Sequence, residues 1–408
     1  MKTVEVLLQQ SKEKNSSPEE TSQSSEPVDE GVGEGALATI INRGPYNKQE
    51  HIKAASATFR FPPEEEACRL AQGYFASFNH TFPIFSHERF MQRMRCDYPP
   101  QKTDDFVWWA TVLVVLTFAH RLRAMSAPAL ADAENSRACP YLGQLLDAAP
   151  KITYMKPSLE AAQVLLATAA ILHGTAMPDH VPMLTSAAIR MLQCNNVHLE
   201  EGLESPEVAK RTERMHTFWV AYIMDKDIAL QFRKPPVLHE QDIGRRPIAR
   251  EILREGLVYS LDSYVEANLF VIAQGLATIQ GQVWSLIYAG STAKTRDALE
   301  AAQEVLNPRL AAWKDSLPFA FKQEDLVGKW PKHAIVNIVT LHFRYFHTLV
   351  ELNKEPPMEP GNPLRGDCPL SKALPDWPHS TSVLAVEAAR NALDLAALTP
   401  RGNFQNVW

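Results

Sequence analysis

Histidine is the residue type in this sequence that first suggests chemistry, because imidazole can bind a metal or transfer a proton. The chain contains 13 histidines. A helical zinc hydrolase needs the spacing HExxH, which places two imidazoles on one face of a helix. His239-Glu240 is followed by Ile243 where the second histidine would stand, and His342 and His347 are too far apart to share a face. These spacings predict structural or surface histidines.

Motifs for phosphate binding and nucleophilic catalysis are also missing. The glycines at 31–35 look like the start of a dinucleotide loop, but no expected strand precedes them and no helix follows. Gly290–Thr295 lacks the GK[ST] ending of a P-loop, and no G-x-S-x-G elbow occurs. Asp225 and Asp227 lie near the end of an amphipathic helix, where structural pairing is expected more than acid–base catalysis. We therefore expect a protein that is not an enzyme.

The cysteines do not form a metal site. They are far apart and include no CxxC pair: Cys68, Cys96, Cys139, Cys194 and Cys368. An odd number without metal-ligand spacing predicts reduced, intracellular thiols. No secretory signal is found at the N-terminus, and the apolar run Phe106–Ala119 is shorter than the roughly 20 residues that span a bilayer. We expect a soluble protein in which this run forms a buried helix.

The charge of the chain bears on nucleic-acid binding. Its formal net charge is -6, which argues against a broad basic surface that neutralises phosphates. Two basic clusters stand out: Arg89, Arg93 and Arg95, then Arg245, Arg246, Arg250 and Arg254. Neither cluster alternates with aromatic residues as a nucleic-acid groove would, so both are interpreted as solvated charges. A nuclear-import role for Arg245-Arg246 is left open.

Helical periodicity dominates the remainder of the chain. Residues 1–60 are interpreted as a disordered or linker-like tail, because Ser, Glu, Gln and Gly there bury too little apolar surface to offset ordering entropy. Residues 61–408 are predicted to form one all-α, multi-helix regulatory domain, with a proline-rich surface loop at 355–378.

Prolines and capping residues along the chain set the expected helix ends. The clearest helix begins after Ser205-Pro206 and ends before Pro235-Pro236, and another runs from Asp179 as N-cap to about Val197. The other expected helices are Glu64–Phe78, His87–Arg95, Asp105–Met125, Ser158–Gly174, Leu261–Tyr288, Ala293–Leu317, Lys332–Asn353 and Thr381–Leu398.

Two blocks carry a family resemblance. In the first, an aromatic helix runs into Phe82-Pro83-Ile84, and His87 precedes the next helix. Pro83 takes the chain out of helix, and large side chains beside it can fill the gap between two helices. This block resembles the opening signature of the fungal-specific transcription factor domain, found in binuclear zinc-cluster transcription factors.

The second block lies on the helix that ends before Pro235-Pro236. Its matching residues are Arg214, Phe218, Trp219, Tyr222, Asp225, Lys234, Pro235, Pro236 and Asp242. They resemble the family's R-x-x-x-F-W-x-x-Y-x-x-D segment and the turn after it, with Arg233-Lys234 where Gly-Arg is usual. Phe218 and Trp219 are interpreted as core residues. Arg214 and Asp225 fall on about the same helix face but some three turns apart, so each needs its own partner.

The resemblance implies a nuclear domain that regulates transcription, in control of a metabolic or biosynthetic pathway. It implies partners among the transcription machinery or other transcription factors, and it leaves open a small-molecule inducer and a homodimer. The family's six-cysteine zinc cluster precedes this region, and the sequence contains no such run. We therefore expect no cofactor, direct DNA binding or membrane attachment from this chain, and zinc only in a longer product. The alternatives are a small-molecule-sensing helical protein and a helical metabolic enzyme.

Overall fold

The computed structural model describes residues 59–173, 179–199, 208–244, 255–290, 295–320 and 326–353, and a few positions between 387 and 398. These residues all belong to one compact unit, Gly44–Trp408. Several predicted features lie outside them: the tail apart from its last two residues, the loop 355–378, the Ser205-Pro206 helix start, the Arg245–Arg254 cluster and most of the helix Thr381–Leu398.

The described elements are mainly helices, which confirms the all-α prediction. The helices are α4 (Glu64–Ala76), α5 (Phe78–Thr81), α6 (His87–Cys96), α7 (Phe106–Ser126), α8 (Ala131–Thr153), α9 (Leu159–His173), α10 (His180–Cys194), α11 (Val208–Phe232), α12 (Leu269–Val283), α13 (Arg296–Asp315) and α15 (Lys332–Asn353). Short 3-10 turns occupy Pro128–Leu130 and Glu240–Asp242, a π turn at Trp284–Tyr288 extends α12, and a hairpin joins β1 (Leu257–Tyr259) to β2 (Glu266–Asn268).

Helix α7 is the central helix of the N-terminal part. Asp105 caps its start by accepting a hydrogen bond from the Trp108 backbone N–H at 2.9 Å. The helix packs against α4, α8 and α9, and nearly all of its side chains are buried. Both α7 and the helix Leu269–Tyr288 are long and apolar enough to cross a membrane, yet most residues of each are buried among other helices. Buried core helices pass the same test of length and composition, so these two helices are weak evidence for a membrane span.

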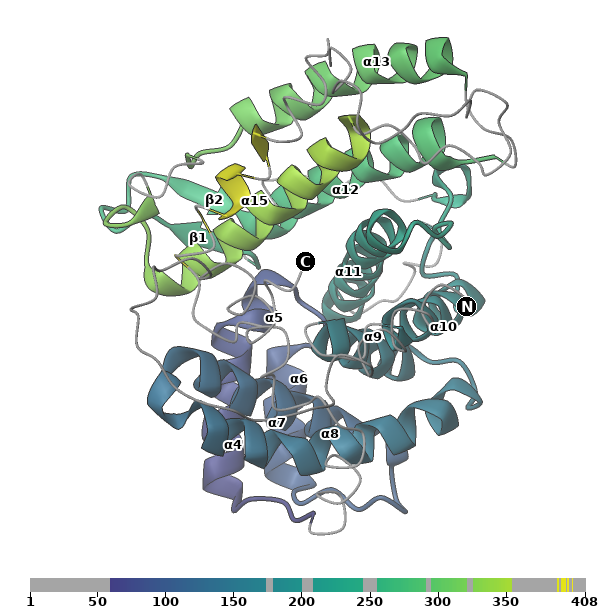
Figure 1. Cartoon of the computed structure of the whole chain (residues 1–408). Helices are drawn as coiled ribbons and strands as arrows, with labels where there is room; N and C mark the ends of the chain where they lie inside the picture. The colour runs from purple at the N-terminus through teal and green to yellow at the C-terminus, as the bar shows by residue number, and fades with distance from the viewer. Residues whose placement is uncertain are drawn as a thin grey trace, which may run out of the picture. The chain divides into compact units, whose positions relative to one another are not determined.

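The C-terminal part is a second helical layer. In Figure 1, α12, α13 and α15 lie side by side, and each of them contacts the other two. Helix α11 joins the two parts, because it packs against α9 and α10 on one side and against α12 and α15 on the other. Residues of the second signature block therefore lie at the junction of the two layers.

Helix α8 was not predicted. It contains Pro140 and Pro150, which remove two backbone donors from the helix. Its buried residues pack against α7, the most extensive helix pair in the described chain, and that packing compensates for the lost hydrogen bonds.

The predicted helix Leu261–Tyr288 was wrong at its start. The chain forms the β1–β2 hairpin there, and the helix begins only at Leu269, where the Asn268 side chain accepts a hydrogen bond from the Val271 N–H at 3.1 Å. The predicted bounds of α10 also differ from the structure. The Asp179 side chain makes no capping hydrogen bond, and the helix ends at Cys194 instead of near Val197.

Candidate functional site

The Phe82-Pro83-Ile84 turn is organised by Asn79, a residue that sequence reasoning missed. The buried Asn79 side-chain oxygen accepts hydrogen bonds from the backbone N–H groups of Ile84 (3.1 Å) and Phe85 (3.0 Å). Its amide nitrogen donates to the Phe85 carbonyl at 2.9 Å. Because Pro83 interrupts the helix, these backbone groups have no helical partners, and one asparagine satisfies three of them.

The predicted residues of this turn have different surroundings. Ile84 is completely buried, and Gln163 of α9 donates a hydrogen bond to its carbonyl at 2.6 Å. Phe82 is half-buried, whereas His87 is exposed and its ring stacks on Phe75 with centroids 4.6 Å apart. The turn therefore ties the start of the domain to α9.

The signature residues of α11 form an aromatic core. Phe218, Trp219 and Tyr222 are buried, and their rings contact one another edge to face. Arg214 lies nearer the start of α11, and its guanidinium donates a hydrogen bond to the Asn195 carbonyl at 2.7 Å. Asp225 has a separate set of partners, so these two charged residues of the block do not pair with each other.

Asp225 holds the chain that leaves α11. Its carboxylate oxygens accept hydrogen bonds from the backbone N–H groups of Val237 at 2.8 Å and Leu238 at 3.0 Å. The buried Lys226 ammonium donates to the Leu238 carbonyl. Burial raises the pKa of the Asp225 carboxyl, although Lys226 and the two N–H groups act in the opposite direction. These contacts satisfy a backbone segment that follows two prolines and cannot continue the helix.

The turn before this segment has a backbone conformation that is typical of glycine. Arg233 has a φ of 50°, the left-handed region that favours glycine, at the position where the related signature has glycine. Lys234 and Pro235 are exposed and Pro236 is buried, whereas Asp242 is exposed in the 3-10 turn that follows.

A buried ion pair lies two residues further along α11, at Asp227, for which the sequence predicted structural pairing but not the partner. The Arg344 Nε of α15 is 3.2 Å from an Asp227 carboxylate oxygen, and both side chains are less than one-tenth exposed. Gln280 of α12 donates to Asp227 at 2.9 Å and to the Thr348 hydroxyl at 3.2 Å. Three helices are therefore joined through one buried carboxylate.

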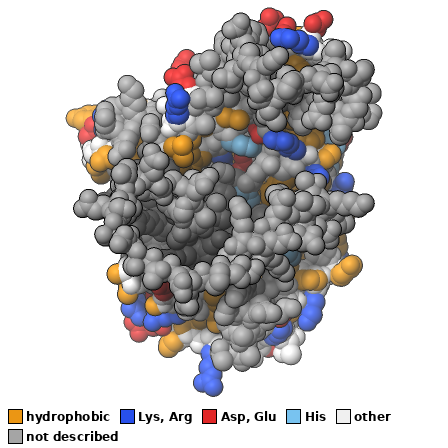
Figure 2. All heavy atoms as spheres, viewed as in Figure 1, with side chains coloured by type: hydrophobic (Ala, Val, Ile, Leu, Met, Phe, Trp, Pro, Cys, Tyr) orange, Lys and Arg blue, Asp and Glu red, His pale blue; other side chains and the backbone are white. Residues whose placement is uncertain are grey.

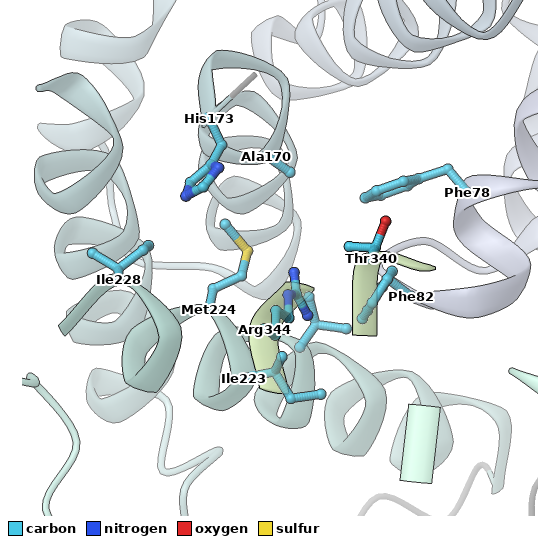
Figure 3. Close-up of a pocket in the computed structure, with 10 residues that line it drawn as sticks. Phe78, Phe82, Ala170, His173, Ile223, Met224, Ile228, Thr340 and Arg344 are labelled. Atoms are coloured by element: carbon cyan, nitrogen blue, oxygen red, sulfur yellow. The ribbon is translucent and has the colours of Figure 1, made fainter. Parts of the chain in front are cut away.

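A small cavity of about 50 Å³, here called the junction cavity, lies beside this pair. Figure 3 shows that its lining side chains come from the first signature block, α9, α11 and α15. Most of them are apolar, and the polar ones are His173, Thr340 and Arg344. Arg344 also lies over the Phe82 ring, 5.4 Å from its centroid. The cavity therefore combines apolar walls with a few buried polar groups.

Burial controls the protonation of the histidine in this wall. His173 is buried, and its Nε2 is 2.7 Å from the Gln231 side-chain oxygen. Burial lowers the pKa of His173 to about 4, with the Asp227 carboxylate opposing this effect and Arg344 adding to it. The imidazole is consequently neutral near pH 7.

The described residues also bear on the predicted metal ligands and charges. Within them, no group of three or more His, Cys, Asp or Glu side chains is placed to hold a metal ion. On the face shown in Figure 2, the coloured acidic and basic side chains are interspersed. His342, one of the predicted structural histidines, is fully buried, and His347 is half-buried near Glu351.

Comparison with known families accounts for the two signature blocks. Residues 71–244 match the model of the fungal specific transcription factor domain. The chain contains a fungal-specific transcription factor domain. This match runs from α4 to just beyond the Asp242 turn, so it includes the Phe82-Pro83-Ile84 corner, the α11 aromatic core and the segment held by Asp225.

Curated relatives point in the same direction. Two proteins named ABC-transporter-regulating transcription factor, from Aspergillus oryzae and Aspergillus fumigatus, are each 31% identical to the chain over 85% and 93% of its length. A Fusaridione A cluster transcription factor from Fusarium heterosporum is 25% identical over 82% of the chain and 62% of its own length. The chain spans only 40% and 44% of the two Aspergillus relatives. No solved structure matches the chain.

Proposed function

We propose that this chain is the regulatory region of a transcription factor and that it controls, in the nucleus, genes of transport or biosynthesis. The fungal-specific transcription factor domain carries this proposal, because its two signature blocks are joined: Gln163 donates both to Ile84 of the first block and to Thr217 on the helix of the second. The names of the relatives, which refer to ABC-transporter regulation and to a biosynthetic cluster, support the choice of target genes. Its partners are then other transcription factors or the transcription machinery.

The proposal is tested by tethering the chain to an unrelated DNA-binding module upstream of a reporter gene. Transcription is expected to change several-fold, in either direction, relative to the module alone. The surface substitution Glu300→Gln should preserve the effect, because Glu300 lies on exposed α13 surface. A tethered chain that accumulates normally but leaves reporter transcription unchanged would contradict the proposal.

Direct DNA binding is tested separately with the purified chain. We expect no sequence-specific complex whose affinity falls steeply with salt, since that dependence arises from phosphate neutralisation by basic side chains. A specific, salt-sensitive complex with a defined operator would show that the chain itself reads DNA.

Small-molecule sensing is a second candidate function, favoured by the junction cavity. Its volume of about 50 Å³ accommodates a small apolar group. Xenon is a suitable probe, because a single apolar atom needs far less room than the roughly 150 Å³ of a benzene site, and binding should raise the melting temperature by mass action. The substitution Ala170→Leu places extra carbon atoms in the cavity and should abolish that rise. An equal rise in the folded Ala170→Leu protein would place the probe elsewhere.

A further inference from the structure

A second and larger cavity lies beside the N-terminal half of α11. Its volume is about 360 Å³, and it shares no lining residue with the junction cavity. Small-molecule sites commonly fall between roughly 300 and 1,000 Å³, so this cavity, here called the cap cleft, has room for a small organic ligand. None of the signature residues lines it, although Phe85 and Ser86, which follow the Phe82-Pro83-Ile84 turn, do.

Three helices begin at the wall of the cap cleft. The lining residues Ser86, Asp105 and Ser158 are the capping residues of α6, α7 and α9, and each side chain accepts a hydrogen bond from a backbone N–H of its own helix. A helix N-terminus carries roughly half a positive charge, which favours anions nearby. The helix termini therefore add positive potential to that of the arginines in the same wall.

The carboxylates that pair with the arginines of this wall differ in their exposure to solvent. Arg89 donates through Nη1 to Glu213, which is only 8% exposed, and through Nη2 it faces Glu160, which is 50% exposed, at 3.5 Å. Arg93 donates to Asp105 at 2.6 Å. Glu160 is thus the loosely bound carboxylate of the cleft, because its ion pair is long and solvated.

The floor of the cleft is aromatic. Phe85, Phe90 and Trp108 line it, and each of them is less than one-tenth exposed. The Arg93 guanidinium lies 4.7 Å from the centroid of the Trp108 ring. The buried indole N–H of Trp108 has no hydrogen-bond partner among the described residues. An apolar floor beneath arginines is suited to a molecule with an apolar body and an acidic end.

We propose that the cap cleft binds a small organic acid that consists of a carboxylate on a single ring or a similarly compact apolar body. The carboxylate takes the place of Glu160 on the outer amino group of Arg89, and the body packs against Phe85 and Phe90. The charged lining consists of Arg89 and Arg93 against Asp105, Glu160 and Glu213. The three helix termini bring this set close to neutral, and displacing Glu160 leaves it positive. This inference goes beyond the proposed function and does not depend on it.

The test compares benzoate with benzamide, its uncharged analogue, in titrations of the full chain followed by calorimetry or by ligand-observed NMR. Glu160→Gln removes the competing carboxylate without touching a buried group. It is expected to strengthen benzoate binding by about two- to fivefold, the range that loss of an exposed ion pair allows. Benzamide affinity should stay the same. Glu300→Gln is the matched control, since it removes an equally exposed carboxylate from α13, which contributes nothing to the cleft.

A second variant keeps the test valid if single changes at Arg89 destabilise the fold. Arg89→Gln alone leaves the buried Glu213 without a counter-ion, whereas Arg89→Gln with Glu213→Gln removes both charges together. The double variant should fold and lose benzoate binding. The inference is overturned if benzoate fails to bind the wild-type and Glu160→Gln chains, if both variants at Glu160 and Glu300 respond alike, or if the folded double variant binds benzoate normally.

Discussion

The two ends of α11 place charged residues in contrasting surroundings. Near the start of the helix, Glu213 faces the cap cleft, where its partner Arg89 and the neighbouring Glu160 are about half exposed. Near the end, Asp225, Lys226 and Asp227 are all at least nine-tenths buried and reach the exit segment, α12 and α15. Glu213 is itself only 8% exposed, so the contrast lies in the partners: Arg89 and Glu160 can exchange partners with solvent, whereas both members of the Asp227–Arg344 pair are enclosed. We call the region around Glu213, Arg89 and Glu160 the adaptable end of the helix, and the region around Asp225, Lys226 and Asp227 the fixed end.

The largest effect is expected when the fixed end loses its central carboxylate. Asp227→Ala leaves the Arg344 guanidinium buried without its counter-ion and should lower the free energy of unfolding by about 3–5 kcal/mol. Urea denaturation followed by circular dichroism measures this change. Replacing both partners, by Asp227→Leu with Arg344→Met, should cost less than the single change. A loss below about 1 kcal/mol for Asp227→Ala, the size typical of a surface pair, would remove the contrast between the two ends.

The next effect concerns the pH dependence of stability. Because burial lowers the pKa of His173 to about 4, while an unfolded histidine titrates near 6.5, the unfolded state takes up a proton first as pH falls. Stability from this residue is complete above about pH 6.5 and declines towards pH 4, by about 3 kcal/mol in total. Between pH 6.5 and pH 4, the unfolding free energy of the wild type should fall by about 3 kcal/mol more than that of His173→Gln, as denaturation curves at several pH values would show. His342, whose pKa burial lowers to about 3, supplies a similar dependence in both proteins.

A smaller effect is expected at the exit segment. Asp225→Asn keeps the size of the side chain but replaces one acceptor oxygen with an amide, so one of the Val237 and Leu238 N–H groups loses its partner. An unsatisfied buried donor costs about 1–3 kcal/mol. The unfolding free energy should fall by this amount, and exchange of the Val237 or Leu238 amide hydrogen should accelerate. Unchanged exchange at both amides would show that the segment is held by other contacts.

Backbone strain at the same turn gives an effect of about 1 kcal/mol. Arg233 occupies the left-handed region, which costs a non-glycine residue on the order of 1 kcal/mol. Arg233→Gly and Arg233→Ala both remove the ion pair to Glu351, so the difference between them isolates the backbone. The glycine variant should be the more stable of the two. Equal stability would mean that the turn relaxes to another conformation.

The smallest effect belongs to the adaptable end. Glu160→Gln should change the free energy of unfolding by less than about 1 kcal/mol, because the Glu160 pair with Arg89 is long and half exposed. The same thermal and urea measurements apply. A loss comparable to that of Asp227→Ala would show that the cleft is as rigid as the junction.

Most of the fold followed from local patterns. Helix α15 has the bounds predicted from its apolar spacing, and α11 ends where Pro235 and Pro236 require. The misses have physical causes. Helix α8 tolerates two internal prolines because it packs along α7, and residues 257–268 form a hairpin because the Gly256 N–H and the Leu257 carbonyl bond to His80, a partner far away in the sequence.

The candidate site was less accessible to sequence reasoning. The signature residues were identified by resemblance, but Asn79 and Gln163 look like ordinary polar residues in the sequence. Their role depends on the backbone groups that Pro83 leaves without helical partners. A search for buried polar residues close to helix-ending prolines would have found Asn79, whereas Gln163 gives no such local signal.

The sequence by itself determined where most of the helices form, because helical periodicity, caps and prolines act over a few positions. Tertiary packing decided which charged side chain meets which: Asp227 pairs with Arg344 of α15, and Glu213 with Arg89 of α6. Such pairs form between helices, and only the long-range arrangement of those helices determines whether a charge is left in water or enclosed. The division of α11 into an adaptable and a fixed end is therefore a property of the fold.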